Sequence, residues 1–223
     1  TGSAEKPGAN GYRKSSLVAT FAAAFPAVAR KLTDAFWPGP LTLILPKHAS
    51  IPDLVTSGLP NVGIRLPDHD LMRQVLRRAN VPIAAPSANP FGMLSPTTAD
   101  HVRRQLGDRI DGIVDGGPCR VGIESPIVQV AGDHAILLRP GGIAVEDIER
   151  VTGPVRHPAV AATEAPEAPG MLASHYAPRT PLTLVDRIPV VPRWPRTGLL
   201  VLNRHLTDRG TMVDPLSTPE FGD

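Results

Sequence analysis

Residues 127–142 read IVQVAGDHAILLRPGG. Two short apolar runs, residues 127–130 and 135–138, flank the dipeptide Gly132-Asp133, which is typical of a tight hairpin turn. This pattern predicts two antiparallel strands that are neighbours in one sheet. A turn rich in proline and glycine closes the second strand, and apolar residues at helical spacing follow it.

Upstream of the hairpin, apolar runs of strand length alternate with segments of helical periodicity. Such alternation predicts an α/β domain, and the hairpin makes its sheet mixed rather than purely parallel. We therefore expect a twisted mixed open sheet with flanking helices. Further strands are expected at residues 41–45, 62–66, 81–85 and 110–114. Helices are expected from residue 15 or 16 to 36, from 68 to 79, from 97 or 98 to 106, and from 145 to 151.

Local signals mark where several of these helices begin and end. Pro26 interrupts the first helical run, so we expect a kink or two separate helices there. Asp68 is a candidate N-cap of the second helix, because a carboxylate can accept hydrogen bonds from the first-turn N–H groups. Gly107 is expected to close the third helix.

The composition changes after the last predicted helix. Residues 153–180 are rich in proline, alanine and glutamate, which predicts a linker. Residues 181–223 contain two strand-like runs and are expected to form part of a second small α/β domain. Residues 1–152 would then hold the first domain, led by a mobile segment at residues 1–14. Because the chain begins with Thr1 rather than methionine, we expect a fragment or a processed chain.

Charge and cysteine content narrow the possible environments. The formal net charge is only +2, which is compatible with a phosphate-bearing ligand or with RNA but is also ordinary for a soluble protein. The single cysteine, Cys119, excludes a disulfide within the chain, and we expect a small, half-buried side chain there. No apolar run reaches the roughly 18 residues of a membrane-spanning helix, so a cytoplasmic protein is expected.

Three loops that follow apolar runs combine polar side chains with glycine or proline. In open α/β sheets, ligands bind in crevices at the carboxyl ends of strands, so these loops are candidates for a single site. Ser87 and Asn89 of the first loop offer hydrogen-bond donors and acceptors. Thr97 lies at a helix start, where free N–H groups favour an anion. Alternatively, these side chains stabilise a turn and cap the helix. The loops are residues 85–98, 115–126 and 137–142.

Two arginines are further candidates. Arg139 ends a strand before a Pro-Gly turn, where its planar guanidinium can bind phosphate or carboxylate; the alternative is a surface arginine. Arg65 interrupts an apolar run and must be paired or lie at a strand end, so an ion pair with Asp68 or Asp70 is the competing interpretation. The glycine-rich loop at residues 115–126 has two interpretations: it lets the backbone approach a ligand closely, or it is a tight connection between strands.

Several common catalytic motifs are missing from the sequence. There is no G-x-x-x-x-G-K-[ST] loop, so ATP would have to be bound in another way. No histidine has the spacing of a metal ligand relative to cysteine or glutamate, and no serine elbow is present.

Taken in order, five motifs resemble those of the Sua5/YrdC family of threonylcarbamoyl-AMP synthases. Their order and spacing match as a set, whereas each alone is weakly specific. The motif SHYAP at residues 174–178 also resembles the linker of longer, Sua5-type members. The five motifs are FWPGPLTL (36–43), GIRLP (63–67), APSAN with SPT (85–89 and 95–97), DGG with GIES (115–117 and 122–125), and LRPG (138–141).

The resemblance implies a nucleotidyltransferase that makes threonylcarbamoyl-AMP and pyrophosphate from L-threonine, bicarbonate and ATP, with Mg²⁺ on the triphosphate. A separate threonylcarbamoyl transferase complex would then modify adenosine 37 of tRNA. By the same resemblance, the threonine is bound by Arg65, Ser87 and Ser125. The nucleotide is contacted by Asn61, Asn89, Thr97, Arg139, His175 and Tyr176.

The sequence departs from the family pattern in two places. The family begins with a threonine-binding strand-turn and a Lys-x-Arg motif for the triphosphate, and residues 1–30 contain neither; Arg13 and Lys14 are adjacent. Pro126 replaces a threonine, which removes a hydroxyl and an N–H group. These departures keep three alternatives open: a non-catalytic RNA- or nucleotide-binding module with weak tRNA binding, a truncated inactive fragment, and a carbamoyl-adenylate-forming domain of the hydrogenase-maturation type.

Overall fold

The structure is a computed structural model that describes Val18 and residues 20–158 of the chain. The expectations for the lead-in, for most of the linker and for the partial second domain lie outside these residues. So do the nucleotide candidates His175 and Tyr176.

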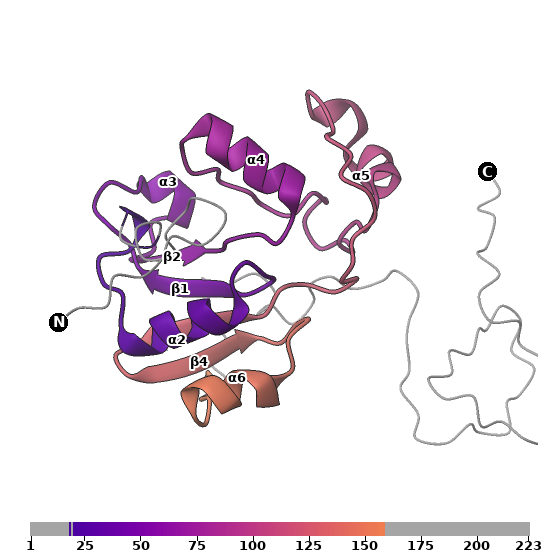
Figure 1. Cartoon of the computed structure of the whole chain (residues 1–223). Coiled ribbons are helices and arrows are strands. Elements are labelled where there is room, and N and C mark those ends of the chain that lie inside the picture. The colour runs from indigo at the N-terminus through magenta and orange to yellow at the C-terminus, as the bar shows by residue number, and fades with distance from the viewer. Residues whose placement is uncertain (1–17, 19, 159–223) are drawn as a thin grey trace, which may run out of the picture. The chain divides into compact units, whose positions relative to one another are not determined.

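Four strands form one mixed sheet in the order β2-β1-β3-β4 (Figure 1). β1 and β3 are parallel, whereas β2 pairs antiparallel with β1 and β4 pairs antiparallel with β3. The mixed open sheet and the hairpin at Gly132-Asp133 are thus confirmed. The strands are β1 (Thr42–Pro46), β2 (Asn61–Ile64), β3 (Ile127–Ala131) and β4 (His134–Arg139).

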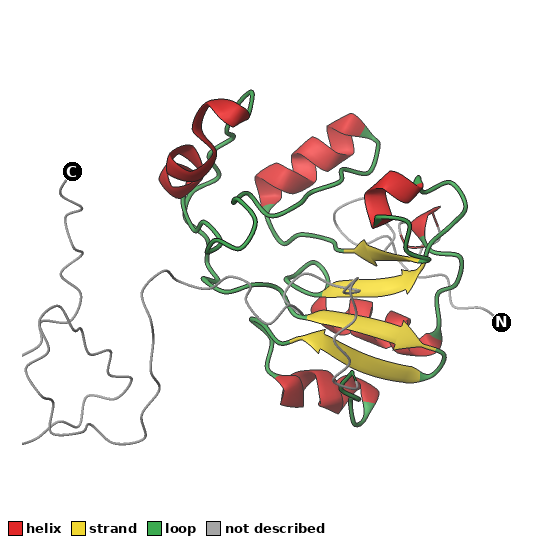
Figure 2. Cartoon of the chain, turned by 180° about the vertical axis from the view of Figure 1, so that it is seen from behind, coloured by secondary structure: helices red, strands yellow, loops and turns green. Residues whose placement is uncertain are grey.

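The main core lies on one face of this sheet. Leu43 and Leu45 of β1 point into it and are fully buried, whereas Ile44 between them belongs to a smaller cluster on the other face. Helices α2 (Ala27–Phe36) and α6 (Val145–Thr152) close the main core through Leu32 and Ile148. Seen from behind in Figure 2, the strands lie in front of these helices. The alternation along β1 is the two-residue period of a strand with both faces covered.

The predicted helix boundaries are largely confirmed. Pro26 is the N-cap of α2, so the first helical run does break there. α5 (Ala99–Leu106) begins after Thr98, whose hydroxyl accepts a hydrogen bond from the N–H of His101, and it ends at Gly107. Two short elements were not predicted: the helical turn α3 (Asp53–Thr56) and the 3-10 turn η1 (Gly107–Arg109).

The N-cap prediction for the second helix is wrong. α4 (Asp70–Ala79) is capped by His69, whose imidazole accepts a hydrogen bond from the N–H of Met72 at 3.4 Å. Asp68 instead pairs with Arg120 and lies near Arg73. Since Asp70 also pairs with Arg73, neither carboxylate is the ion-pair partner that was considered for Arg65.

Two predicted strands are absent from the described part of the chain. Residues 81–85 and 110–114 belong to no strand there, although both runs are apolar. A strand requires a partner, and the described residues offer none to either run. The expectation of a half-buried Cys119 is also wrong, because this side chain is exposed.

The first domain extends beyond its last predicted helix. Ile148 of α6 is fully buried in the core. Beyond α6, the N–H of Arg156 donates to the carbonyl of Ala135, and the N–H of Leu137 donates to the carbonyl of Arg156. Residues up to 156 are therefore part of the sheet domain. Within residues 20–158, no helix has the length and apolar character needed to cross a membrane.

Candidate functional site

Three of the predicted site residues meet at one edge of the sheet. Arg65 directly follows β2, Arg139 is the last residue of β4, and Ser125 lies two residues before β3. The register brings these positions together, because Ile127 pairs with both Thr42 and Arg139, and Leu43 pairs with Ile64. The site thus lies at the carboxyl ends of β2 and β4 and at the amino ends of β1 and β3.

Ser125 connects the two arginines. Nη1 of Arg65 donates a hydrogen bond to its hydroxyl oxygen at 2.6 Å. Nε and Nη2 of Arg139 both donate to its backbone carbonyl, at 3.1 and 2.7 Å. Both guanidinium groups are thereby oriented by one residue. We call Arg65, Ser125 and Arg139 the arginine–serine cluster.

The turn after β4 fixes the backbone of Ser125 from the other side. A Cβ atom on Gly141 would lie 2.3 Å from the carbonyl oxygen of Glu124 and 2.4 Å from the nitrogen of Pro126, so only glycine fits there. The N–H of Gly142 donates to the carbonyl of Glu124 at 3.1 Å. Pro126 is fully buried and accepts a hydrogen bond from the N–H of Thr42, so the residue that departs from the family pattern joins the sheet edge.

The cluster is electropositive. Desolvation of the guanidinium and, second, the charge of Arg139 lower the pKa of Arg65 from its ordinary value. Arg65 makes no salt bridge to any residue that the structure describes. Two like charges in contact with one residue are stabilised by a bound anion, and an arginine fork matches a carboxylate or a phosphate.

The glycine-rich loop that leads to Ser125 is held by the start of α4. Nη2 of Arg120 donates to the backbone carbonyl of Asp68 at 2.8 Å and to its carboxylate at 2.7 Å. Nε2 of His69 lies 3.2 Å from the carbonyl oxygen of Gly116, and since Nδ1 accepts from the helix, Nε2 is the donor. A Cβ on Gly116 would collide with this ring at 2.7 Å. These contacts link residues about fifty positions apart, and nothing in the sequence predicted them.

The structure does not bring the first predicted loop into the cluster. Ser87 is exposed and makes no hydrogen bond within the described residues. Nδ2 of Asn89 donates to the carbonyls of Pro90 and Met93, both at 3.0 Å, which favours the turn-stabilising alternative for Asn89. Its buried Oδ1 has no partner in the described part of the chain. The roles of Ser87 and Asn89 in ligand binding therefore stay predictions.

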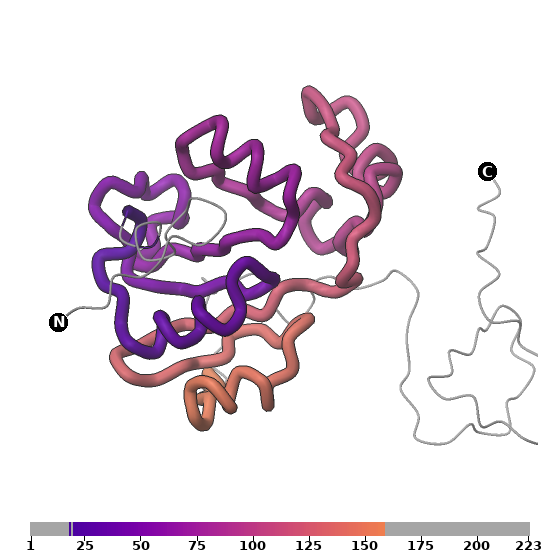
Figure 3. Tube along the Cα trace, viewed as in Figure 1, coloured from indigo at the N-terminus to yellow at the C-terminus, as the bar shows by residue number. Residues whose placement is uncertain are grey.

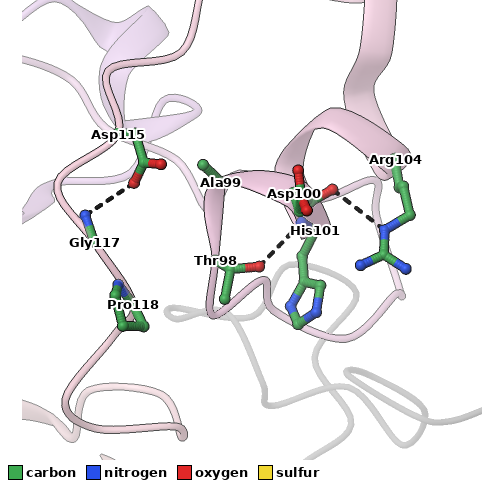
Figure 4. Close-up of a pocket in the computed structure, with 8 residues that line it drawn as sticks. All are labelled: Thr98, Ala99, Asp100, His101, Arg104, Asp115, Gly117 and Pro118. Atoms are coloured by element: carbon green, nitrogen blue, oxygen red, sulfur yellow. Dashed lines mark hydrogen bonds between the residues drawn. The ribbon is translucent and has the colours of Figure 1, made fainter. Parts of the chain in front are cut away.

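Thr97 lies beside a separate cavity of about 490 Å³ at the start of α5. Its hydroxyl is 3.2 Å from Nδ1 of His101, so this threonine already has a partner. Figure 4 shows the cavity between α5 and the glycine-rich loop, where Asp115 accepts from the N–H of Gly117. No member of the arginine–serine cluster lines it. The lining residues are Thr98, Ala99, Asp100, His101, Arg104, Asp115, Gly117 and Pro118.

Asn61 lies at the other end of β2 from Arg65. Asn61 pairs with Pro46 of β1. It lies four residues before Arg65, so their Cα atoms are about 13 Å apart along an extended strand. The assignment of Asn61 to the nucleotide also stays a prediction. Within the described residues, no group of three or more histidine, cysteine, aspartate or glutamate side chains could hold a metal ion.

Two family models match the chain. The Sua5/YciO/YrdC model, described as telomere recombination, matches residues 4–141. A second model, described as the C-terminal domain of threonylcarbamoyl-AMP synthase, matches residues 143–206. Together they cover most of the sequence.

Known proteins resemble this chain over about three quarters of its length. The threonylcarbamoyl-AMP synthase of Bacillus subtilis is 48% identical over 167 residues, which cover 74% of this chain and 48% of that protein. The crystal structure of Pyrococcus abyssi Sua5 complexed with L-threonine superposes with a TM-score of 0.69 at 40% identity, covering 73% of this chain and 49% of that one. A variant of the same Sua5, in which a histidine and the next tyrosine are changed to alanine, superposes with a TM-score of 0.67 at 40% identity. The match covers 70% of this chain and 46% of that one. This chain thus spans about half the length of the relatives it matches.

Proposed function

This chain belongs to the Sua5/YciO/YrdC family, and on that premise we propose that it acts as a threonylcarbamoyl-AMP synthase. The substrates are L-threonine, bicarbonate and ATP, and the product serves the modification of adenosine 37 in tRNA. The observation that carries the proposal is the arginine–serine cluster. It presents two oriented cations at one sheet edge, and both a threonine carboxylate and the phosphates of ATP are anions that such cations bind.

Arg65 is the proposed ligand of the threonine carboxylate. Nη1 is held by the hydroxyl of Ser125, which fixes the plane of the guanidinium and leaves its other N–H groups for the substrate. The solved relative in complex with L-threonine supports a threonine site in this fold. The amine of the bound threonine combines with bicarbonate to form a carbamate, with loss of water.

In the second step, a carbamate oxygen attacks the α-phosphorus of ATP. The bond from that phosphorus to the bridging oxygen breaks, and pyrophosphate leaves. Arg139 contributes positive charge to this step. It does so without the edge formed by Nε and Nη2, because the carbonyl of Ser125 occupies that edge. Catalysis in this scheme consists of positioning and charge stabilisation, without a covalent enzyme intermediate.

Mg²⁺ is proposed to enter with the nucleotide. The described residues contain no cluster of acidic or imidazole ligands, so the phosphate oxygens and water would supply most of its coordination. Mg²⁺ would neutralise part of the triphosphate charge next to the cluster.

His175 and Tyr176 are proposed to close over the nucleotide. They are the only adjacent His-Tyr pair in the sequence, and a solved relative was altered at an adjacent pair of the same types. Because residues up to 156 belong to the sheet domain, we propose that the linker begins after residue 156 and continues to about residue 180. Residues 181–223 are proposed to belong to the second domain; the C-terminal model match, residues 143–206, overlaps this range in part and also includes α6.

Release of pyrophosphate tests the proposed reaction. The chain is incubated with ATP, Mg²⁺, bicarbonate and labelled L-threonine, and pyrophosphate and labelled adenylate are measured. Release that requires both threonine and bicarbonate is expected. Release without either would contradict the assignment, and salt-dependent tRNA binding without any turnover would instead favour a non-catalytic RNA-binding module.

A further inference from the structure

Arg65 and Ser125 reach their contact along two different paths of the chain. Figure 3 shows the chain leaving the sheet after β2 and returning to it before β3. On the outgoing path, Leu66 is buried and its carbonyl accepts a hydrogen bond from the N–H of Gly39. On the returning path, no residue from 115 to 125 is buried. The backbone of Arg65 is therefore fixed beside the core, whereas the position of Ser125 depends on what holds the loop that carries it.

His69 connects the two paths. Its Nε2 donates to the carbonyl oxygen of Gly116 at 3.2 Å, while its Nδ1 accepts from the N–H of Met72 at 3.4 Å. Gly116 packs directly against the ring, because a Cβ atom there would lie 2.7 Å from Cε1 of the imidazole. Capping the helix requires only the acceptor, Nδ1. The donor on Nε2 and the close approach of Gly116 therefore serve the loop rather than the helix.

Arg120 forms a second connection between the same two segments. Its Nη2 donates to the backbone carbonyl and to the carboxylate of Asp68. The side chain of Arg120 is 75% exposed and that of Asp68 is 47% exposed, and an ion pair this open to solvent is weakened by water and salt. The imidazole of His69 adds van der Waals contact with Gly116, which salt does not screen. We therefore expect His69 to be the principal connection at physiological ionic strength.

We propose that His69 is a positioning residue for the threonine site. Through Gly116 it holds the glycine-rich loop so that the hydroxyl of Ser125 meets Nη1 of Arg65. The threonine ligand in this inference rests on the proposed function, whereas the positioning of the loop does not. His69 acts without touching the substrate, by orienting the two residues that bind it.

Two substitutions separate the roles of the two ring nitrogens. Asparagine can place its side-chain oxygen where Nδ1 lies and is a preferred N-cap residue, but it is too short to reach Gly116. Glutamine is longer and can donate to Gly116 from its amide nitrogen, but it is not among the preferred N-cap residues. His69→Asn should therefore keep the helix cap and release the loop. His69→Gln should keep the loop in place and weaken the cap.

Three backbone amides report on the loop and on the cap. The N–H of Cys119, within the loop, donates to the carbonyl of Thr97 at 2.8 Å. The N–H of Gly142 donates at 3.1 Å to the carbonyl of Glu124, the residue before the serine. The N–H of Met72 is the one that the imidazole accepts at the start of α4. The first two amides follow the position of the loop, and the third follows the cap.

Hydrogen exchange of these amides, resolved by NMR, tests the positioning without any ligand. In His69→Asn, exchange should speed at least about threefold at Cys119 and Gly142 and stay unchanged at Met72. In His69→Gln, the pattern should be reversed. The proposal is overturned if His69→Asn leaves the exchange of Cys119 and Gly142 unchanged, or if both variants give the same pattern.

Isothermal titration with L-threonine measures the consequence for the site. His69→Asn should weaken binding about fivefold or more, the equivalent of one net hydrogen bond, and His69→Gln less than about twofold. His48→Asn is the matched control, because His48 is exposed and hydrogen-bonds with Ser50 in the turn after β1. Equal weakening by both His69 variants would overturn the proposal. If the parent chain does not bind L-threonine, the proposed function fails, and the exchange pattern alone decides the role of His69.

Discussion

Nη1 of Arg65 lies 2.6 Å from the hydroxyl of Ser125, although sixty positions separate the two residues in the chain. The contact joins the end of β2 to the start of β3 across β1, and Arg139 approaches the same serine from β4. The geometry of one hydroxyl therefore depends on the register of all four strands. This dependence leads to the first prediction.

Arg65→Ala should weaken binding of L-threonine by about 10- to 100-fold, because a hydrogen bond to a charged group contributes roughly 1.5–3 kcal/mol. Isothermal titration with L-threonine measures the change. Arg103→Ala is the matched control, since Arg103 is exposed and pairs with Asp100 of its own helix. Equal losses in both variants would contradict a specific role for Arg65.

Gly141→Ala should destabilise the protein by about 1–3 kcal/mol, because the added Cβ would overlap the backbone of residues 124–126. Urea unfolding measures the free energy. Gly112→Ala has open space around the added carbon and should change stability by no more than about 0.5 kcal/mol. If the two substitutions were equally tolerated, the turn after β4 would not constrain Ser125.

Arg120→Ala should speed hydrogen exchange in the loop at residues 115–122 while costing at most about 1 kcal/mol of stability, because the pair with Asp68 is largely exposed. Raising the salt concentration should narrow the difference in exchange between the variant and the parent protein. Unchanged exchange in the loop would show that Asp68 does not hold it.

Ile148→Ala should cost about 2–5 kcal/mol, as expected for a large apolar side chain removed from a packed core. Urea unfolding monitored by Trp37, which is buried in the same core, reports the loss. Glu146 lies on the exposed side of α6, so Glu146→Ala should change the free energy of unfolding by no more than about 0.5 kcal/mol. A tolerated Ile148→Ala would exclude α6 from the sheet domain.

The hydrogen bond and charge of Lys47 lower the pKa of Asp53 from its ordinary value of 3.8. A lowered pKa in the folded state means that the ion pair stabilises the protein above pH 3.8, and that this contribution is lost as the pH falls through the folded-state pKa. Lys47→Met should therefore return the pKa of Asp53 toward 3.8. Carboxyl chemical shifts followed by NMR measure it, and an unchanged value would contradict the assigned cause.

Local chemistry predicted the parts of the fold that are local. The hairpin at Gly132-Asp133, the break at Pro26 and the end of α5 at Gly107 each depend on a few neighbouring residues, and all three were confirmed. The strands predicted at residues 81–85 and 110–114 were wrong, because apolar character alone does not provide a pairing partner. The positions of Arg65, Arg139 and the loop that holds Ser125 were candidates from the sequence, and the family resemblance assigned their ligands; the structure places the three residues in contact, and their ligand roles stay predictions.

Contacts between residues far apart in the chain could not be predicted from the sequence. Nothing near Asp68 indicates that its partner is Arg120, or that His69 rather than Asp68 caps α4. Both depend on how the loop before β3 returns to the start of α4. Opposite charges fifty positions apart are too common in one sequence to predict a pair.

The parallel pairing of β1 with β3 determines when this sheet can form. Thr42 pairs with Ile127, so the centre of the sheet closes only after the chain between them has been brought round as one long loop. Closing such a loop loses entropy before any contact compensates for it, which makes the central pairing slow. During synthesis on the ribosome, β1 and β2 can pair early, but the core can form completely only after β3 has left the ribosome.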